Sequence, residues 1–328
     1  MTQNIKITML GTTGAGKTCY ILGLYSTMQL GLQGFSLSCQ DMDDDLRLTE
    51  QWEQLVFAEE GEDRWPSATG NEPHNYVFDF TYGLKPMMGF EWLDYRGGAM
   101  SDLSTESDVN ILRTHLVQSS CVFLCISGEL LKQKLTESQL NIIARRAGVT
   151  RMNRYLAELA KAKQPTNENP CPVVITITKY DQCFQRNKDE ILEDIKKIFS
   201  IFFQPNSGWL TMICPVSLGK ELAENKNTGE IEPKNMHLPL VFAIYCGYSN
   251  QLRQQENIAK SNRDNLNSLR EGNFLDRWFN SEQIKSLEGT LYNNQEQIEG
   301  LKKQMRFLSQ ELTNANLYLS GTEMQLDV

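Results

Sequence analysis

The sequence predicts a doubly wound α/β domain with a mainly parallel, six-stranded sheet that has one antiparallel edge strand, followed by a C-terminal helical coiled coil. Three observations support this. Strand-like and helix-like segments alternate along the first part of the chain, a glycine-rich loop separates the first strand from the first helix, and an apolar seam with a seven-residue period begins at Ile284. We therefore expect an α/β domain over 1–250, a helical connector over 251–280, a coiled coil over 281–320 and a tail over 321–328.

The glycine-rich loop has the pattern G-x-x-x-x-G-K-[ST]. It lies between an apolar strand over 4–10 and a helix over 17–30. Such a loop surrounds a phosphate with backbone N–H groups, and the N-terminus of the helix adds partial positive charge. Lys17 would bind the β and γ phosphates, and the Thr18 hydroxyl would ligate Mg²⁺. The sequence therefore predicts a phosphate site formed by Gly11, Thr13, Gly14, Ala15, Gly16, Lys17, Thr18 and Cys19.

Composition limits the classes of partner. The net charge of −9 argues against nucleic acid. No apolar run approaches the ~20 residues that span a bilayer, so we expect no transmembrane segment. The first residues are polar and lead directly into a strand, which is unlike a secretory signal. Eight scattered cysteines form no C-x-x-C pair, and Cys121 with Cys125 lacks the further ligands that zinc needs. We expect a reduced, cytoplasmic protein.

An acidic cluster, Asp41 with Asp43 to Asp45, precedes an amphipathic segment. A calcium loop would need a central glycine and a terminal glutamate, which this segment lacks. Acidic residues are also typical of the first turn of a helix. We therefore interpret the cluster as the start of a helix that runs to about Glu60, inside an insert near 41–62.

The apolar seam after Ile284 predicts a coiled coil. One row contains Ile284, Leu291, Ile298, Met305, Leu312 and Leu319, and the other Leu287, Asn294, Leu301, Leu308 and Ala315. The seam would pair either with a second chain or with the helix-compatible stretch 250–272. The strict period favours a homodimer.

Two further motifs follow apolar strands. Asp94-Tyr95-Arg96-Gly97 is D-x-x-G, in which the carboxylate can hold Mg²⁺ through water and the Gly97 N–H can meet a γ-phosphate. Thr178-Lys179-Tyr180-Asp181 ends a buried strand two elements later. Because ligands bind at the carboxyl ends of parallel strands, the three motifs indicate one site.

Taken together, these motifs resemble the translation-factor-like class of P-loop GTPases, which includes the Ras-like small GTPases, over roughly 5–250. The resemblance implies GTP or GDP and Mg²⁺ as ligands. Asp181 would accept the N1 and N2 hydrogens of guanine, and Lys179 would lie over the base. Thr178 stands where this family usually has Asn. Ser217-Leu218 lies where the family has Ser-Ala, whose backbone N–H meets the guanine oxygen.

The same resemblance implies a first-switch Thr that closes on Mg²⁺, for which Thr69 is the best candidate and Ser67 the alternative. Three features depart from the family pattern: the insert near 41–62, the heptad tail, and Gly98, which stands where Ras-like enzymes carry a water-orienting Gln. Bacterial small GTPases, including the double-GTPase-like group, are similar in pattern.

Because the water-orienting Gln is missing, we expect slow hydrolysis, with Arg96 as a contributor and an arginine or glutamine from a partner.

Three functions remain open at this point. The first is a GTP-operated switch with Lys17, Thr69, Arg96 and Gly97 at the reacting phosphate, acting through its coiled coil on an unidentified effector or activator. The second is a nucleotide-binding scaffold with little turnover. The third is a P-loop ATPase or kinase, against which Asp181 and D-x-x-G both argue.

Overall fold

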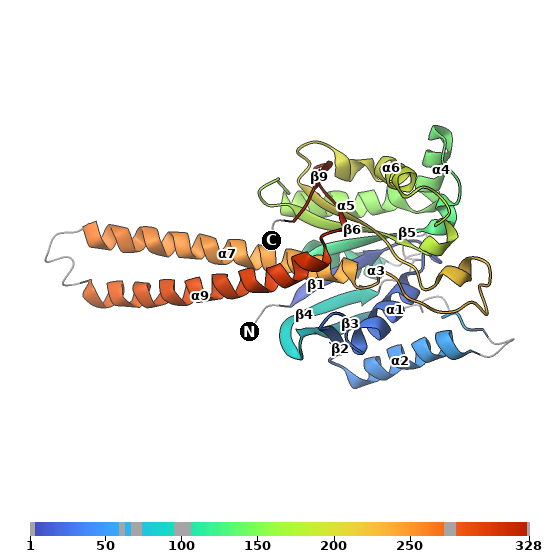
Figure 1. Ribbon diagram of the computed structural model, residues 1–328. Helices are drawn as coiled ribbons and strands as arrows, with labels where there is room; N and C mark the ends of the chain where they lie inside the picture. Colours follow the sequence, from blue (N-terminus) through green and yellow to red (C-terminus); the bar gives the residue numbers. More distant parts are fainter. Residues whose placement is uncertain (1–3, 59–62, 67–73, 95–105, 272–279, 327–328) are drawn as a thin grey trace. The chain divides into compact units, whose positions relative to one another are not determined.

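The computed structural model is a mixed α/β protein that divides into two compact units (Figure 1). The first unit comprises Met1–Ala243 with Asn314–Gln325, and the second comprises Ile244–Thr313 with Leu326–Val328. The structure describes residues 4–58, 63–66, 74–94, 106–271 and 280–326. The two units are described separately.

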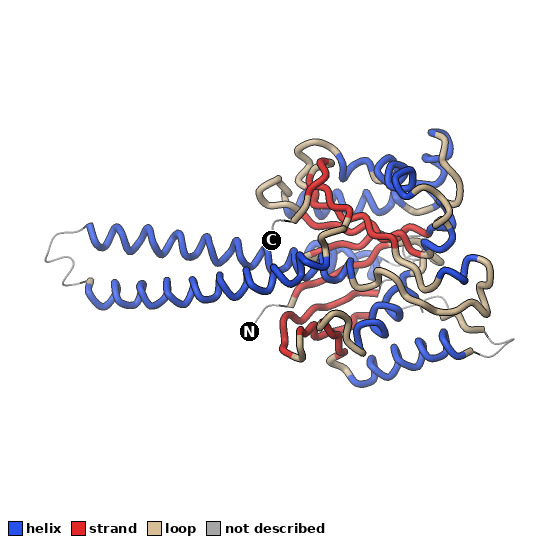
Figure 2. Tube along the Cα trace, in the orientation of Figure 1, coloured by secondary structure: helices blue, strands red, loops and turns tan. Residues whose placement is uncertain are grey.

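A nine-stranded sheet, counted over the described residues, forms the centre of the first unit (Figure 2). Its order is β2-β3-β4-β1-β5-β6-β7-β8-β9. The strands are β1 (Ile5–Leu10), β2 (Phe35–Cys39), β3 (His74–Tyr82), β4 (Lys85–Asp94), β5 (Cys121–Ser127), β6 (Cys171–Thr178), β7 (Trp209–Pro215), β8 (Asn316–Leu319) and β9 (Thr322–Met324).

The expected six strands with one antiparallel edge strand were wrong. Strands β4, β1, β5, β6 and β7 are parallel, but β2 and β3 add antiparallel pairs at one edge and β8 and β9 at the other. The last two strands come from residues assigned to the coiled coil and the tail. The edge of β7 between Leu210 and Ile213 presents backbone groups that need partners, and residues 316–319 supply them.

Helices cover both faces of the sheet, which explains why every residue of β5 and β6 is buried. Side chains of β5 alternate between two clusters. Val122, Leu124 and Ile126 pack with apolar residues of α3 (Glu106–Gln118), α4 (Glu137–Arg146), α5 (Val149–Lys163) and α6 (Lys188–Ile198). On the other face, Phe123 lies against Trp92 and Tyr20, with ring centroids 5.0 and 6.3 Å away. Tyr20 belongs to α1 (Lys17–Gln29).

The insert is the helix α2 (Met42–Phe57). Its N-cap is Asp41, whose carboxylate accepts hydrogen bonds from the backbone N–H groups of Asp43 and Asp44 at 2.9 and 3.0 Å. This confirms the interpretation of the acidic cluster as a helix start, because a side-chain acceptor satisfies N–H groups that have no partner inside the helix.

The second unit pairs two long helices from one chain (Figure 1). Helix α7 (Leu238–Glu271) enters it at Ile244, and α9 is Ser281–Glu311. Ion pairs join Arg270 to Glu288 and Glu256 to Lys302. The two pairs are 14 residues apart on each helix, in opposite directions, so the helices are antiparallel in a constant register. The seam therefore pairs with the stretch 250–272 of the same chain, which was the intramolecular one of the two expected pairings. Dimerisation with a second chain stays a prediction.

Two glycine substitutions test the placement of the turn between β8 and β9 and of helix α9. Gly321 lies between β8 and β9 with φ +81°, and a Cβ there would be 2.1 Å from the Phe203 carbonyl oxygen. Gly300, inside α9, has open space around its Cβ position. We expect Gly321→Ala to destabilise the protein by about 1–3 kcal/mol. We expect Gly300→Ala to stabilise α9 by up to ~1 kcal/mol. Urea unfolding followed by circular dichroism measures both, and a neutral Gly321→Ala would contradict the β8–β9 placement.

Candidate functional site

The glycine-rich loop connects β1 to α1. Gly14 and Gly16 have φ values of +77° and +79°, which favour glycine. The loop closes on itself through a hydrogen bond from the Ala15 N–H to the Thr12 carbonyl oxygen at 3.1 Å. Gly16 is the N-cap of α1, and no side chain among the described residues caps this helix end. An uncapped helix N-terminus is typical of an anion site.

The side chain of Lys17 folds into the loop and is 5% exposed. Its ammonium group donates hydrogen bonds to the carbonyl oxygens of Gly11 at 2.9 Å and Thr12 at 3.1 Å. Burial lowers the pKa of Lys17, while Cys125 and the carboxylate of Asp94 act in the opposite direction. The loop thus holds a buried cation on two neutral carbonyl groups.

Asp94 ends β4, and the parallel pairing of β4 with β1 places it level with Met9. It is 3% exposed, and its Oδ1 atom has no hydrogen-bond partner among the described residues. Burial raises the pKa of Asp94, opposed by Lys17, His74 and Arg47 in that order. An orphaned carboxylate oxygen beside a buried lysine fits a cation ligand. Within the described residues no three His, Cys, Asp or Glu side chains gather as a metal cage.

A single carboxylate without a surrounding cage of ligands is compatible with Mg²⁺, which proteins usually hold through one or two side chains and the phosphates of a substrate. Thr18, the other expected ligand that the structure describes, is half-buried in the first turn of α1. Thr69, Arg96 and Gly97 lie outside the described residues.

The end of β6 is bonded directly to the glycine-rich loop. The Thr178 hydroxyl donates to the Ala15 carbonyl oxygen at 2.6 Å, and it lies 3.3 Å from the Ile126 carbonyl oxygen at the end of β5. A Cβ on Gly16 would lie 3.3 Å from Thr178, so the two segments are in van der Waals contact. Two of the sequence motifs, 167 residues apart at their first residues, therefore form one structure.

Asp181 is 6% exposed and held by two side chains. Its Oδ1 atom accepts from the Ser217 hydroxyl at 3.0 Å, and its Oδ2 atom accepts from Gln182 at 2.9 Å. The Ser217 oxygen in turn accepts from the Gly219 N–H at 3.1 Å. Each carboxylate oxygen has a second lone pair, so Asp181 can accept two more hydrogen bonds from a ligand. The turn at Ser217 and Leu218 is thus tied to Asp181.

Lys179 adopts a left-handed backbone conformation with φ +48°, so the chain turns sharply between Thr178 and Asp181. A Cβ on Gly128 would lie 2.4 Å from the Lys179 carbonyl oxygen. The Lys179 ammonium pairs with Glu129 at 3.2 Å, in a partly exposed position where such a pair contributes little energy. The pair with Glu129 therefore holds the Lys179 side chain only weakly.

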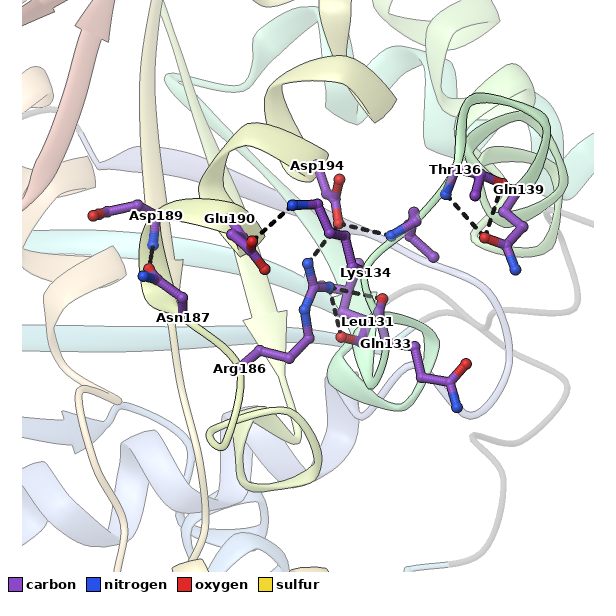
Figure 3. Close-up of polar contacts among 11 residues, drawn as sticks. Leu131, Gln133, Lys134, Thr136, Gln139, Arg186, Asn187, Asp189, Glu190 and Asp194 are labelled. Atoms are coloured by element: carbon purple, nitrogen blue, oxygen red, sulfur yellow. Dashed lines mark hydrogen bonds and ion pairs between the residues drawn. The ribbon is translucent and has the colours of Figure 1, made fainter.

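A buried arginine that sequence analysis missed supports this region (Figure 3). Arg186 donates to the carbonyl oxygens of Leu131 and Gln133 at 2.8 and 2.9 Å and pairs with Asp194 at 2.8 Å. Asp194 also accepts from the Leu135 N–H at 3.4 Å. These bonds join the segment after β5 to the segment after β6. No local pattern marks an arginine whose partners are distant carbonyl groups.

A second buried arginine, Arg64, was also missed. It follows α2 and is 5% exposed. It donates to the carbonyl oxygens of Leu55 at 2.8 Å, Asn227 at 2.9 Å and Gly229 at 3.0 Å. The segment after the insert is therefore fixed to the loop that follows Ser217.

Comparisons with known proteins add little. No protein-family model matches the chain, and no curated protein matches it in sequence. Among solved structures, 55 chains match. One is assigned as nucleolar GTP-binding protein 1 from Plasmodium falciparum, with 14% identity and a TM-score of 0.36, over 82% of this chain and 97% of that chain. A likeness this weak establishes neither a family nor a function for this chain.

The hydroxyl of Thr178 can be tested without changing the shape of its side chain. Thr178→Val keeps the volume but leaves the Ala15 carbonyl oxygen without its donor, whereas Thr178→Ser keeps the donor. We expect the valine variant to lose about 1–3 kcal/mol of stability in thermal unfolding, and the serine variant less than half of that. Equal losses in both variants would show that packing at the methyl group, not the hydrogen bond, joins the two segments.

The buried carboxylate of Asp94 predicts a stabilising substitution. Because its pKa is raised, the folded protein favours the protonated form, and stability falls as the pH rises from the unfolded value through the folded one. At pH 7, which lies above the unfolded pKa, burial of this carboxyl group therefore costs folding energy. We expect Asp94→Asn to raise the melting temperature of the ligand-free protein by about 3 °C, equivalent to roughly 1 kcal/mol. An unchanged or lower value at pH 7 would contradict the burial cost.

Proposed function

We propose that this chain is a GTP-binding protein of the P-loop type that requires Mg²⁺, hydrolyses GTP to GDP slowly and acts as a molecular switch. The hydrogen bond between Thr178 and Ala15 carries the proposal. Because this bond joins the two segments, it supports a single ligand whose phosphates lie in the glycine-rich loop and whose base lies at Asp181. None of the eight cysteines is in a disulfide, which agrees with a reducing compartment, and we propose the cytoplasm.

The phosphates would bind at the N-terminus of α1. The Lys17 ammonium would exchange its two carbonyl partners for phosphate oxygens, which are stronger acceptors for a cation. Gly14 and Gly16 let the loop backbone approach the phosphates without Cβ atoms between them. The chain would thus neutralise part of the phosphate charge with groups that the fold already positions.

Guanine selectivity would come from Asp181. A carboxylate only accepts hydrogen bonds, and guanine presents two adjacent N–H donors on its N1 and N2 atoms. Adenine presents no matching pair there, so it would leave the two remaining lone pairs of the buried carboxylate without donors, which is costly. Ser217 and Gln182 would hold the carboxylate in position. Lys179 would lie over the base, and the Leu218 N–H would meet the guanine oxygen.

Thr18, Thr69 and Asp94 would hold Mg²⁺, which would supply positive charge to the β and γ phosphates. The orphaned Oδ1 atom of Asp94 supports this assignment. Hydrolysis would be slow because Gly98 replaces the expected water-orienting residue. Arg96 would contribute charge, and a partner would supply a further arginine or glutamine. If Arg96 takes part, Arg96→Ala will lower the single-turnover rate of hydrolysis.

The helical hairpin of the second unit would pass the nucleotide state to an effector or join two copies of the chain. The absence of a water-orienting residue next to Gly97 also favours a second candidate function, a nucleotide-binding scaffold with little turnover. Measured turnover separates these two functions. A P-loop ATPase is the third, and base preference separates it from both.

Competitive nucleotide binding tests the proposal. Nucleotide-free protein is titrated with fluorescent GDP in Mg²⁺, and unlabelled GTP, GDP and ATP then displace the probe. We expect GTP and GDP to compete at least about 100-fold better than ATP, because ATP cannot satisfy the Asp181 carboxylate. Lys17→Met should abolish binding of the probe, and Asp181→Asn should remove the guanine preference while phosphate contacts remain.

Each outcome decides between the candidate functions. Equal competition by ATP would overturn the guanine assignment and favour an ATPase. Absence of binding in the wild-type protein would overturn nucleotide binding itself. Tight binding without release of inorganic phosphate over many hours would favour the scaffold.

A further inference from the structure

Asp94, the candidate Mg²⁺ ligand, lies between two neighbouring strands at the end of β4. On one side it is level with Met9 of β1, the strand that leads into the glycine-rich loop. On the other side it is level with His74, the first residue of β3. Directly opposite residues of an antiparallel pair have Cβ atoms about 5 Å apart on the same face of the sheet. His74 is therefore the cross-strand neighbour of the Asp94 side chain.

The pair of His74 and Asp94 is the last one in the ladder between β3 and β4. A pair at the end of a ladder opens more easily than a pair inside it, because it has a neighbouring pair on one side only. On the side of β3, the position of Asp94 therefore depends on what holds His74 in place.

A carboxylate of the helical insert holds His74. The His74 Nε2 atom donates a hydrogen bond to the Asp44 Oδ1 atom at 2.7 Å, since an ionised carboxylate can only accept. Asp44 lies in the first turn of α2, and its side chain is 14% exposed. The same Oδ1 atom pairs with the Arg47 guanidinium at 3.0 Å. Arg47 in turn lies 5.1 Å from the centre of the Tyr76 ring, two residues along β3 from His74.

We call Asp44, Arg47, His74 and Tyr76 the α2 clamp, because together they attach α2 to β3 at two points. The His74 and Tyr76 rings meet at an angle of 66° with their centroids 4.5 Å apart, an edge-to-face arrangement that aromatic rings favour. The His74 ring is thus held by a hydrogen bond from one element and by a ring contact within another.

The first turn of α2 has a separate attachment to α1, which it lies beside in Figure 1. Asp45 accepts hydrogen bonds from the Tyr25 hydroxyl and from the Gln29 side-chain amide, the second at 3.4 Å. Tyr25 is buried, and its ring centroid lies 5.7 Å from that of Phe78 on β3. Because α1 holds the first turn of α2 independently of His74, that turn can act as a fixed support for the end of β3.

We propose that Asp44 and His74 are positioning residues for Mg²⁺ binding: the α2 clamp holds the end of β3 against Asp94 and so keeps the Asp94 carboxylate in place for the cation. This inference rests on the proposed binding of nucleotide and Mg²⁺. It gives the insert that contains α2 a role at the site, in addition to lengthening the first switch region. Because equilibrium coupling is reciprocal, bound Mg²⁺ and nucleotide would also stabilise the attachment of α2.

Two variants of His74 test the hydrogen bond. His74→Phe keeps a ring beside Tyr76 but removes the donor, whereas His74→Gln keeps a donor. The affinity for fluorescent GDP is first measured in EDTA. At a fixed GDP concentration, Mg²⁺ is then added, and the Mg²⁺ midpoint is the concentration that gives half of the further change in bound probe.

We expect His74→Phe to raise the Mg²⁺ midpoint about tenfold, the lower end of the loss when a residue that orients a metal ligand is removed. The affinity for GDP in EDTA should change less than about twofold, because the glycine-rich loop is not part of the clamp. His74→Gln should restore most of the loss, since its amide can still donate to Asp44.

Asp44 is tested through its coupling to His74. Asp44→Asn keeps an acceptor oxygen, whereas Asp44→Leu does not. We expect Asp44→Leu to raise the Mg²⁺ midpoint about as much as His74→Phe, and the double variant no more than either, since both changes remove the same hydrogen bond. Additive losses would show that the two residues act separately, and would overturn the clamp.

Glu91 is the matched control on β4. It lies three residues before Asp94, hence on the opposite face of the sheet, and pairs with Lys6 at 3.2 Å. Glu91→Gln should change the Mg²⁺ midpoint less than about twofold, because a partly exposed pair contributes little. An equal rise in Glu91→Gln and His74→Phe would show that any weakened contact of β4 has this effect, and would overturn the proposal.

The remaining outcomes separate this inference from the proposed function. A wild-type Mg²⁺ midpoint in His74→Phe would overturn the inference. An equal loss of GDP affinity in EDTA would also overturn it, because the clamp would then support only the fold. Thermal unfolding confirms that each variant is folded. If the wild-type protein binds no probe, nucleotide binding itself fails, and if it binds the probe equally with and without Mg²⁺, the Mg²⁺ requirement fails. In both cases the clamp loses its assignment.

Discussion

The hydrogen bond from the Thr178 hydroxyl to the Ala15 carbonyl oxygen is the constraint on which the candidate site depends. It joins the ends of two strands that have β5 between them in the sheet. Because both partners are buried, breaking it would leave a polar group without a partner in a dry environment. The distance between the backbone of the glycine-rich loop and Asp181 is therefore fixed by the fold, and a ligand does not have to set it.

The ligand-free site is a region of the fold where charge is buried at a cost. Lys17 rests on two carbonyl groups, and one oxygen of Asp94 has no hydrogen-bond partner within the part of the chain that the structure describes. Burial lowers the pKa of Lys17 and raises the pKa of Asp94, so it favours the neutral form of both groups. Evolution commonly retains such destabilising groups where they bind a ligand, since the ligand recovers the energy that folding loses. The same groups would be hard to explain in a structural role.

Local patterns made part of the site predictable. The glycine-rich loop and T-K-x-D were read from short segments, because each needs particular residues at fixed spacing after a strand. Arg64 and Arg186 could not be found this way, since their partners are backbone carbonyl groups distant in sequence, and any residue supplies those. Strand β8 was missed for a related reason: a four-residue strand has little pattern of its own and depends on the open edge of β7.

The path of the chain through the two units has a consequence for synthesis. The first unit contains residues up to Ala243 and again from Asn314 to Gln325, with the helical hairpin as an insertion between them. On the ribosome, β7 therefore emerges about 100 residues before β8. Throughout that interval the growing polypeptide presents an unpaired strand edge, a known route to aggregation. A product terminated between β7 and β8 would keep this edge unpaired and would be a candidate for quality control.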